Sequence, residues 1–485
     1  MSSQDKEKEE EKKNEAESDE QETESKNGSK TIKKKKYKYK SQEKPRDFLY
    51  WLKFILMVFG VLILGFGIYC TICMFIPLGG FSNIISAAVG QVSGFLIFFF
   101  LLAALLLIKV LPSVYHGLSN TRDQKIINSR IKALKKIIIS VGIILSVIAS
   151  LPLAATPISI QNAEDEFQEV YGDDWELKIP QEIKTSFMTS RFNLFNYYLG
   201  IPQSDCEVKT DIEYYTDNEI YLSYDVYYPK PTEYELPGHN STIIKIHGGG
   251  WTEGDKGLGN MLHVNKYLAS QGYIVFDIQY GLLDTGEDTT LPTPDHVRGD
   301  FTLHDMVFHI GYFTHQLEDK LAARYQASLD SVFIMGGSAG GHLTGVVGLG
   351  YNDPYFSGNF SNAVNLRGIV PIYPANDAKR ISSGDRDTLI PGTPKSNPLT
   401  YEKFTPSKLA DKNDPATLIY HGLQDGIVDP QESKDIENSL EDKNVDCIRL
   451  TFPFAAHASD FLANTNFAQV WMFYLERFLY LQQDL

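Results

Sequence analysis

Three long apolar stretches constrain the fold of this chain more than any other feature. They cover residues 54–78, 81–108 and 137–156, and each reaches the ~20 helical residues that cross the hydrocarbon core of a bilayer. Helices that are apolar on every side, with no amphipathic partner, are untypical of a soluble domain. The first stretch also starts too late and is too long for a cleavable signal peptide. We therefore expect three transmembrane helices.

Basic residues beside these stretches predict their orientation. The segment 33–40 is rich in Lys and precedes the first stretch, whereas the link Gly79-Gly80 is uncharged. The second link carries Arg122, Lys125 and four more basic side chains against the single acid Asp123. Because Lys and Arg favour the cytoplasmic side, we expect the amino terminus and the second link in the cytosol. The chain after about residue 157 is then lumenal or extracellular.

Residues 1–45 contain mainly Glu, Lys, Ser, Asn and Gln, with almost no large apolar side chain. Such a composition cannot bury enough apolar surface to fold, so a disordered cytosolic tail is expected. The basic run 33–40 suits a simple topogenic flank better than a binding site for anionic lipid, although both interpretations remain open.

The rest of the chain is acidic. Residues 161–485 carry 23 basic and 47 acidic side chains, which argues against nucleic-acid binding, since that function needs a basic surface. Four cysteines are too few for a disulfide framework. Cys206 and Cys447 could form one disulfide if this region is exported, and the sequence leaves that pairing open. Two sequons, at Asn240 and Asn359, predict glycosylation in the same exported region.

From about residue 207, short β-branched and aromatic runs alternate with longer helical patterns. This alternation is typical of an α/β domain built on a mostly parallel sheet flanked by helices, and we assign it to residues 207–485. Residues 158–206 have weak patterning and form either a stalk or a cap. The strands are expected as a hairpin over 210–228 and then at 242–246, 273–280, 331–336, 367–373, 416–421 and 447–452.

The strongest motif is GGSAG at residues 336–340. It follows the apolar run 331–335 directly and precedes a helical stretch over 341–350. A strand-to-helix turn this tight tolerates no bulk two residues before or after its serine, and it leaves the hydroxyl exposed. The motif predicts that Ser338 is a nucleophile.

A glycine run, HGGGW at residues 247–251, ends an earlier predicted strand. Acyl transfer needs backbone N–H groups aimed at a developing oxyanion, and successive glycines let the main chain approach the substrate. We expect the donors to be Gly249, Gly250 and Ala339. Trp251 could line the acyl pocket or pack in the core.

A serine nucleophile needs a base and an orienting acid later in the chain. Of the three histidines after Ser338, His342 lies one helical turn away from the serine and His421 ends a strand. His457, in the loop after the last predicted strand, is therefore the expected base. Asp425, in the tight turn after the strand 416–421, is the expected acid, with Asp429 as the alternative.

With these residues in place, the domain resembles α/β-hydrolase esterases that carry an HGGGW oxyanion loop. That group includes hormone-sensitive-lipase-like carboxylesterases, feruloyl-type esterases, kynurenine formamidases and prenylcysteine methylesterases. The resemblance covers residues 207–485 and rests on HGGGWTEGDK at 247–256, GGSAGGHL at 336–343, HGLQDGIV at 421–428 and the late His457. The chain departs from many members at Gly337, where a larger polar residue is common, and at Gly281, where an Arg is common.

The resemblance implies an α/β-hydrolase fold and a carboxylic-ester hydrolase with a Ser-His-Asp triad. The three expected transmembrane helices lie outside the resemblance, precede this fold and would anchor it to a membrane. No metal or cofactor is implied. The substrate is expected to be an ester, and the expected membrane anchor suggests an apolar or lipid-linked one. An amidase or formamidase would use the same triad. A prenylcysteine methylesterase conflicts with the expected topology, because its substrate is cytosolic. An inactive adhesion module on this fold is the alternative outside the enzymes, and a transporter is disfavoured by the few spans and the lack of membrane-embedded charge.

Overall fold

The computed structural model describes residues 47–483, apart from residues 77, 120–122, 218–219, 260 and 357. The expected disordered tail, 1–45, and its basic run therefore lie outside the described residues. So does Arg122 of the second link.

The expected apolar stretches are helical and longer than the apolar runs themselves. The structure has three helical stretches that are long and apolar enough to cross a membrane: α2 Phe48–Phe75, α3 Phe81–Leu118 and a third that spans Gln124–Tyr171. The last consists of α4 Gln124–Ala154 and α5 Thr156–Tyr171, which are separated by Ala155 alone. The helices also include charged residues beside the apolar runs, such as Lys53 and Lys109, because a charged side chain does not interrupt the backbone hydrogen bonds of a helix.

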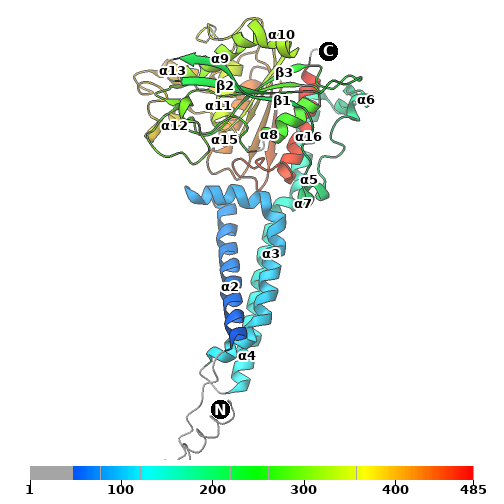
Figure 1. The fold of residues 1–485 in the computed structure, drawn as a ribbon, viewed down its shortest axis with the longest axis vertical. Coiled ribbons are helices and arrows are strands. Elements are labelled where there is room, and N and C mark those ends of the chain that lie inside the picture. The colour runs from blue at the N-terminus through cyan, green and yellow to red at the C-terminus, as the bar shows by residue number, and fades with distance from the viewer. Residues whose placement is uncertain are drawn as a thin grey trace, which may run out of the picture. The chain divides into compact units, whose positions relative to one another are not determined.

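The second apolar helix, α3, is bent near its amino-terminal end (Figure 1). At the end of its first segment, the amide of Gly94 donates to the hydroxyl of Tyr197 at 2.8 Å, and this hydroxyl donates in turn to the carbonyl of Gln91 at 3.2 Å. A side chain inserted into the hydrogen-bond ladder is a known cause of helix kinks. Gly94 has no room for a side chain, since an added Cβ would lie 2.6 Å from the Tyr197 ring.

The mostly parallel sheet expected from the sequence is confirmed. Eight strands lie in the order β1-β2-β4-β3-β7-β8-β9-β10, with β1 and β2 antiparallel at one edge and parallel pairing from β4 to β10 (Figure 1). A two-residue pair, β5 with β6, was not expected. The strands are β1 Glu207–Asp217, β2 Ile220–Tyr228, β3 Ser241–Ile246, β4 Ile274–Ile278, β5 Leu282–Leu283, β6 Arg298–Gly299, β7 Ser328–Gly337, β8 Leu366–Ile372, β9 Ala416–Gly422 and β10 Cys447–Phe452.

Helices cover both faces of this sheet. One apolar core lies between the sheet and α9, α11 and α15, and the other between the sheet and α5, α8 and α16. Every residue of β3 and β4 is buried, as expected for parallel strands covered on both sides. The helices of this part are α6 Gln181–Lys184, α7 Leu194–Leu199, α8 Met261–Ser270, α9 Leu303–Gln316, the π-helix η3 Leu317–Leu321, α10 Ala322–Tyr325, α11 Ala339–Gly350, α12 Ala378–Ile381, α13 Pro398–Lys403, α14 Pro406–Leu409, α15 Pro430–Glu441 and α16 Asn466–Gln482, with 3-10 turns η1 Trp175–Lys178, η2 Asp295–Val297 and η4 Gly384–Arg386.

Residues 158–206, for which the sequence allowed a stalk or a cap, pack against the sheet domain. Phe167 of α5 is fully buried against the ring of Tyr474 in α16, and Glu166 accepts a hydrogen bond from the amide of Arg449 in β10 at 3.2 Å. The side chain of Arg191 bridges Glu164 and Glu176, at 2.8 Å to each. This stretch therefore joins the apolar helices to the sheet.

The two cysteines of the exported region lie too far apart to pair. Cys206 directly precedes β1 and Cys447 begins β10, and these strands form opposite edges of the eight-stranded sheet. Seven strand spacings of about 4.8 Å separate them by roughly 30 Å, whereas a disulfide needs Cα atoms about 6 Å apart. Both are free thiols.

Candidate active site

Ser338 occupies a tight turn between β7 and α11, as the GGSAG motif predicts. Its backbone has φ 57° and ψ −118°, a conformation that an L residue adopts only when its surroundings enforce it. The flanking glycines explain how. An added Cβ at Gly336 or Gly340 would lie 2.5 or 2.2 Å from the carbonyl oxygen of Ile246, so both positions must lack a side chain. The serine hydroxyl is thereby held at the carboxyl end of the sheet.

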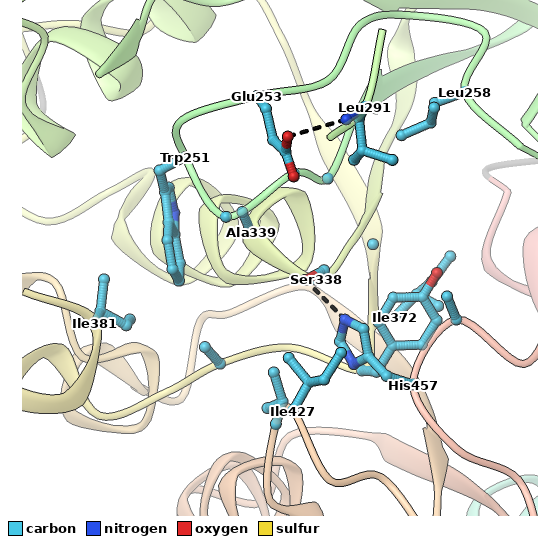
Figure 2. A pocket seen from close by; sticks show the side chains of 18 of the residues that line it. Trp251, Glu253, Leu258, Leu291, Ser338, Ala339, Ile372, Ile381, Ile427 and His457 are labelled. Carbon is cyan, nitrogen blue, oxygen red and sulfur yellow. Dashed lines mark hydrogen bonds between the residues drawn. The ribbon is translucent and has the colours of Figure 1, made fainter. Parts of the chain in front are cut away.

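The structure brings the three residues expected for nucleophile, base and acid together. His457 Nε2 lies 2.9 Å from Ser338 Oγ (Figure 2). His457 Nδ1 lies 2.7 Å from Asp425 Oδ2. The serine comes from the β7–α11 turn, the aspartate from the loop after β9 and the histidine from the loop after β10. The carboxyl ends of the parallel strands β7, β9 and β10 thus bring these residues to one edge of the sheet, as in other open α/β sheets.

The Asp425 carboxylate is buried and fully engaged. Its Oδ1 accepts from the amides of Ile427 and Val428, each at 2.9 Å, and its Oδ2 lies 3.3 Å from His421 Nε2 as well as against His457. Burial by itself raises the pKa of this carboxyl, but the two imidazoles outweigh burial and hold the pKa well below its usual range. Asp425 is therefore poised as an anion that orients His457.

The alternative acid has a different position. Asp429 is the N-cap of α15 and accepts from the amide of Gln431 at 3.0 Å. The structure therefore favours Asp425. His342, which was not expected to be the base, is fully buried and donates from Nε2 to the carbonyl of Phe404 at 2.9 Å.

The glycine run forms a loop beside the serine. Gly249 and Gly250 have φ 121° and 62°, and an added Cβ at Gly248 would lie 2.8 Å from the carbonyl oxygen of Gly337. Ala339 is the first residue of α11, where a backbone N–H has no acceptor within the helix. Gly249, Gly250 and Ala339 line the same cavity as Ser338, and their role as oxyanion donors stays a prediction.

A cavity of about 610 Å³ opens over Ser338 (Figure 2). Trp251 lines it and is 4% exposed, with its ring edge against His342 at 5.4 Å between ring centroids. Trp251 thus both lines the cavity and packs in the core. Other apolar side chains on the lining are Leu258, Met261, Leu291, Ile427 and Phe461.

Tyr373 is a site residue that the sequence did not single out. It directly follows β8, its ring lies 4.6 Å from that of His457, and its hydroxyl donates to Asp460 at 3.0 Å. An added Cβ at Gly337 would lie 2.9 Å from this hydroxyl, which explains why a glycine precedes the serine here. Its position at the carboxyl end of a predicted strand was the available signal.

Gly281, the second departure from the family pattern, has a similar cause. An added Cβ there would lie 2.7 Å from the ring of Phe301 and 2.8 Å from that of His309, and its amide donates to His309 Nδ1 at 3.2 Å. Burial lowers the pKa of His309 to about 4, so this ring is neutral and can accept. The close approach of these rings requires glycine.

Buried charges lie beneath the cavity. Lys245 of β3 is 2% exposed, and burial lowers its pKa although Asp277 and Asp460 oppose that effect. Burial raises the pKa of Asp277 to about 6. Asp277 accepts from the amide of Gly257 at 2.8 Å and from the Asn265 amide at 2.8 Å, so it fixes the end of the HGGGWTEGDK segment.

Two polar residues of the second apolar helix also reach the site loops, and sequence reasoning missed them. Asn83 donates to the carbonyl of Gly426 at 2.8 Å. Gln91 donates to the carbonyl of Ala458 at 3.2 Å and accepts from the amide of Leu462 at 2.8 Å. The signal was an amide side chain within an apolar run, since polar groups in such runs are costly unless they have a partner.

The two sequon asparagines are half-buried, and the neighbouring Ser361 hydroxyl is fully buried, where it donates to Glu318 at 2.5 Å. Glycosylation of Asn240 and Asn359 stays a prediction.

Comparison with known proteins gives a consistent result for this domain. Residues 224–440 match the family model described as BD-FAE. The probable carboxylic ester hydrolase LipM of Mycobacterium tuberculosis is 25% identical over 246 residues, which cover 49% of this chain and 53% of LipM. Esterase LipC of the same organism is 22% identical, over 45% of this chain and 53% of LipC. The chain thus spans about half the length of the curated relatives it matches.

Among solved structures, esterase B of Lactobacillus rhamnosis, inhibited by a tributyrin phosphonate, superimposes with a TM-score of 0.46 at 19% identity. The alignment covers 66% of this chain and 97% of the esterase.

Proposed function

We propose that this chain, an α/β-hydrolase of the esterase/lipase superfamily, is a membrane-anchored hydrolase of carboxylic esters that acts through an acyl-enzyme on Ser338. The observation that carries the proposal is the unbroken contact from Ser338 Oγ through His457 to Asp425, at 2.9 and 2.7 Å. An inactive module on this fold would have no need of that alignment or of the strained serine.

In the proposed reaction, His457 Nε2 takes the proton of Ser338 as Oγ attacks the ester carbonyl. Asp425 accepts the Nδ1 hydrogen bond and stabilises the imidazolium that forms. The amides of Gly249, Gly250 and Ala339 receive the oxyanion, and each such donor contributes on the order of 3 kcal/mol in related sites. His457 then protonates the departing alcohol, and water repeats the cycle on the acyl-enzyme.

The proposed topology places this site outside the cytosol. The three candidate spans and the basic second link support a topology in which residues after about 157 are lumenal or extracellular.

Labelling with a fluorophosphonate probe tests both parts of the proposal. In microsomes, we expect labelling of the wild type and of Ser396→Ala, an exposed serine distant from the site in sequence, and no labelling of Ser338→Ala. Labelling should also require permeabilised vesicles. An unlabelled wild type would contradict the hydrolase mechanism, whereas labelling in sealed microsomes would contradict only the topology.

Hydrolysis of matched ester and anilide substrates by an unlabelled portion of the same preparation then separates an esterase from an amidase. We expect turnover of the ester, because an ester carbonyl is attacked more readily than an amide carbonyl and an alcohol oxygen is the better leaving group. Faster turnover of the anilide would contradict the ester assignment.

A further inference from the structure

The amino-terminal segment of α3, residues 81–94, contacts the loops that hold both the acid and the base. Asn83 bonds Gly426, the residue after Asp425, and Gln91 bonds Ala458, the residue after His457, and Leu462. The α3 segment packs tightly against the loop that carries His457, since an added Cβ at Gly90 would lie 3.2 Å from the carbonyl oxygen of Phe454 in that loop. A helix that is a candidate membrane span therefore contacts the site from beside the triad.

This α3 segment has two distinct faces. Its small and polar residues Ser82, Ser86, Gln91 and Ser93 are buried. Phe81 and Ile84, in contrast, are 68% and 53% exposed. A helix with a protein-facing polar side and an exposed apolar side next to a membrane span is suited to the bilayer surface.

The two loops that this segment contacts also expose large apolar side chains. Leu423, Ile427, Phe461 and Leu462 are 43%, 55%, 45% and 40% exposed, and we call these four residues the apolar rim. Leu423 and Ile427 flank the acid, and Phe461 and Leu462 follow the base. Clustered exposed apolar residues of this kind mark an interaction surface rather than ordinary solvent-facing protein.

The rim is continuous with the cavity. Ile427 and Phe461 line the cavity over Ser338 as well as belonging to the rim, and the 610 Å³ volume is within the range of sites that enclose a ligand of drug size. An acyl chain could thus pass from the rim to Ser338 over apolar surface without crossing water.

We propose that the mouth of this cavity opens onto the bilayer surface, and that the substrate is a carboxylic ester whose long acyl chain is dissolved in the adjacent leaflet. This inference rests on the proposed function and adds the class of substrate and its route of entry. The apolar rim contacts the leaflet, and the α3 segment holds the rim at that depth.

Two esters with the same leaving group test the proposal on the full chain in phosphatidylcholine vesicles. 4-Methylumbelliferyl oleate dissolves in the bilayer, whereas 4-methylumbelliferyl acetate reaches the site from water. The variant is Leu423→Asp/Leu462→Asp, which places charge on the rim at two residues that do not line the cavity. The control is Leu399→Asp, a leucine on α13 that is 55% exposed and lies outside the rim and the cavity lining.

The readout is the ratio of the oleate rate to the acetate rate, each counted per site labelled by fluorophosphonate, so that misfolded protein does not contribute. We expect the rim variant to lower the ratio about tenfold, because a charged rim no longer gains the transfer free energy of apolar surface in the leaflet. The control should keep the wild-type ratio. The two single rim variants should each give part of the effect.

An unchanged ratio in the rim variant would overturn the proposal, as would a wild type that hydrolyses the acetate but not the oleate. Either result leaves the proposed function intact. A wild type that hydrolyses neither ester would overturn the proposed function and this inference together.

Discussion

At the scale of single residues, the Asp425 carboxylate has the most demanding environment in the site. It is buried, it accepts two backbone amides, and it contacts two imidazoles. We expect Asp425→Asn to lower kcat by about 10⁴-fold, because the amide favours the wrong His457 tautomer. Steady-state kinetics with a soluble ester would measure this. Asp429→Asn should cost far less, and the reverse order would contradict the assignment of the acid.

The same carboxylate predicts the pH dependence of the reaction. The pKa of Asp425 is held well below its usual range, so the stability it contributes is present above the unfolded-state pKa near ~3.9 and is lost only as pH falls below that value. Between about pH 5 and 8 the acid therefore remains ionised. We expect log kcat/KM to fall toward acid with a limiting slope of one, and a slope of two would indicate that a second group titrates.

Gly337 is constrained by Tyr373. A Cβ at position 337 would press on the hydroxyl that Asp460 holds, and it would displace the ring that packs on His457. We expect Gly337→Ala to lower kcat by about tenfold, comparable to small misplacements of catalytic groups. Tyr373→Phe in the same chain removes the clashing oxygen and should restore part of the loss. An additive loss in the double variant would contradict this account.

At the scale of elements, α3 belongs to the scaffold of the site. Gln91 is 6% exposed and makes two hydrogen bonds to the loop that carries His457. Gln91→Leu would leave the Ala458 carbonyl and the Leu462 amide without these partners, at a cost of about 1 to 3 kcal/mol. We expect slower fluorophosphonate labelling of Ser338. Gln431→Leu, at an exposed position on α15, is the matched control, and equal labelling rates in the two variants would contradict a role for Gln91.

Strands could be predicted from the sequence more completely than the contacts between distant segments. The strands from β1 to β10 other than β5 and β6 were found within a few residues, because β3, β7 and β8 are apolar runs bounded by turn residues. The triad could be assembled from motif order, since parallel strands bring their carboxyl ends together. Tyr373 and Gln91 could not be assigned, because their roles depend on packing between distant segments. The bend in α3 could not be predicted either, since the hydroxyl that bonds to the Gly94 amide belongs to Tyr197, about a hundred residues away in the sequence.

At the scale of the whole molecule, the strand order predicts the redox state of the chain. Cys206 and Cys447 sit at opposite edges of the sheet, and all four cysteines, which lie within the described residues, are free. We expect the denatured but unreduced protein to take up four alkyl groups, as counted by intact mass. Uptake of two groups would reveal a disulfide, and a peptide that links Cys206 to Cys447 would contradict the strand order.

The near-continuous passage from α4 into α5 sets how far the domain can move. Only Ala155 separates the two helices, and α5 is packed against β10 and α16. A flexible linker would let a tethered enzyme sweep a volume that grows with linker length, and it would meet substrates at any height above its anchor. A helical junction allows the domain almost none of this motion. In the proposed membrane-anchored arrangement, the domain therefore stays at one short, fixed distance from the membrane. Its position then restricts which substrates it meets before any selectivity of the site applies.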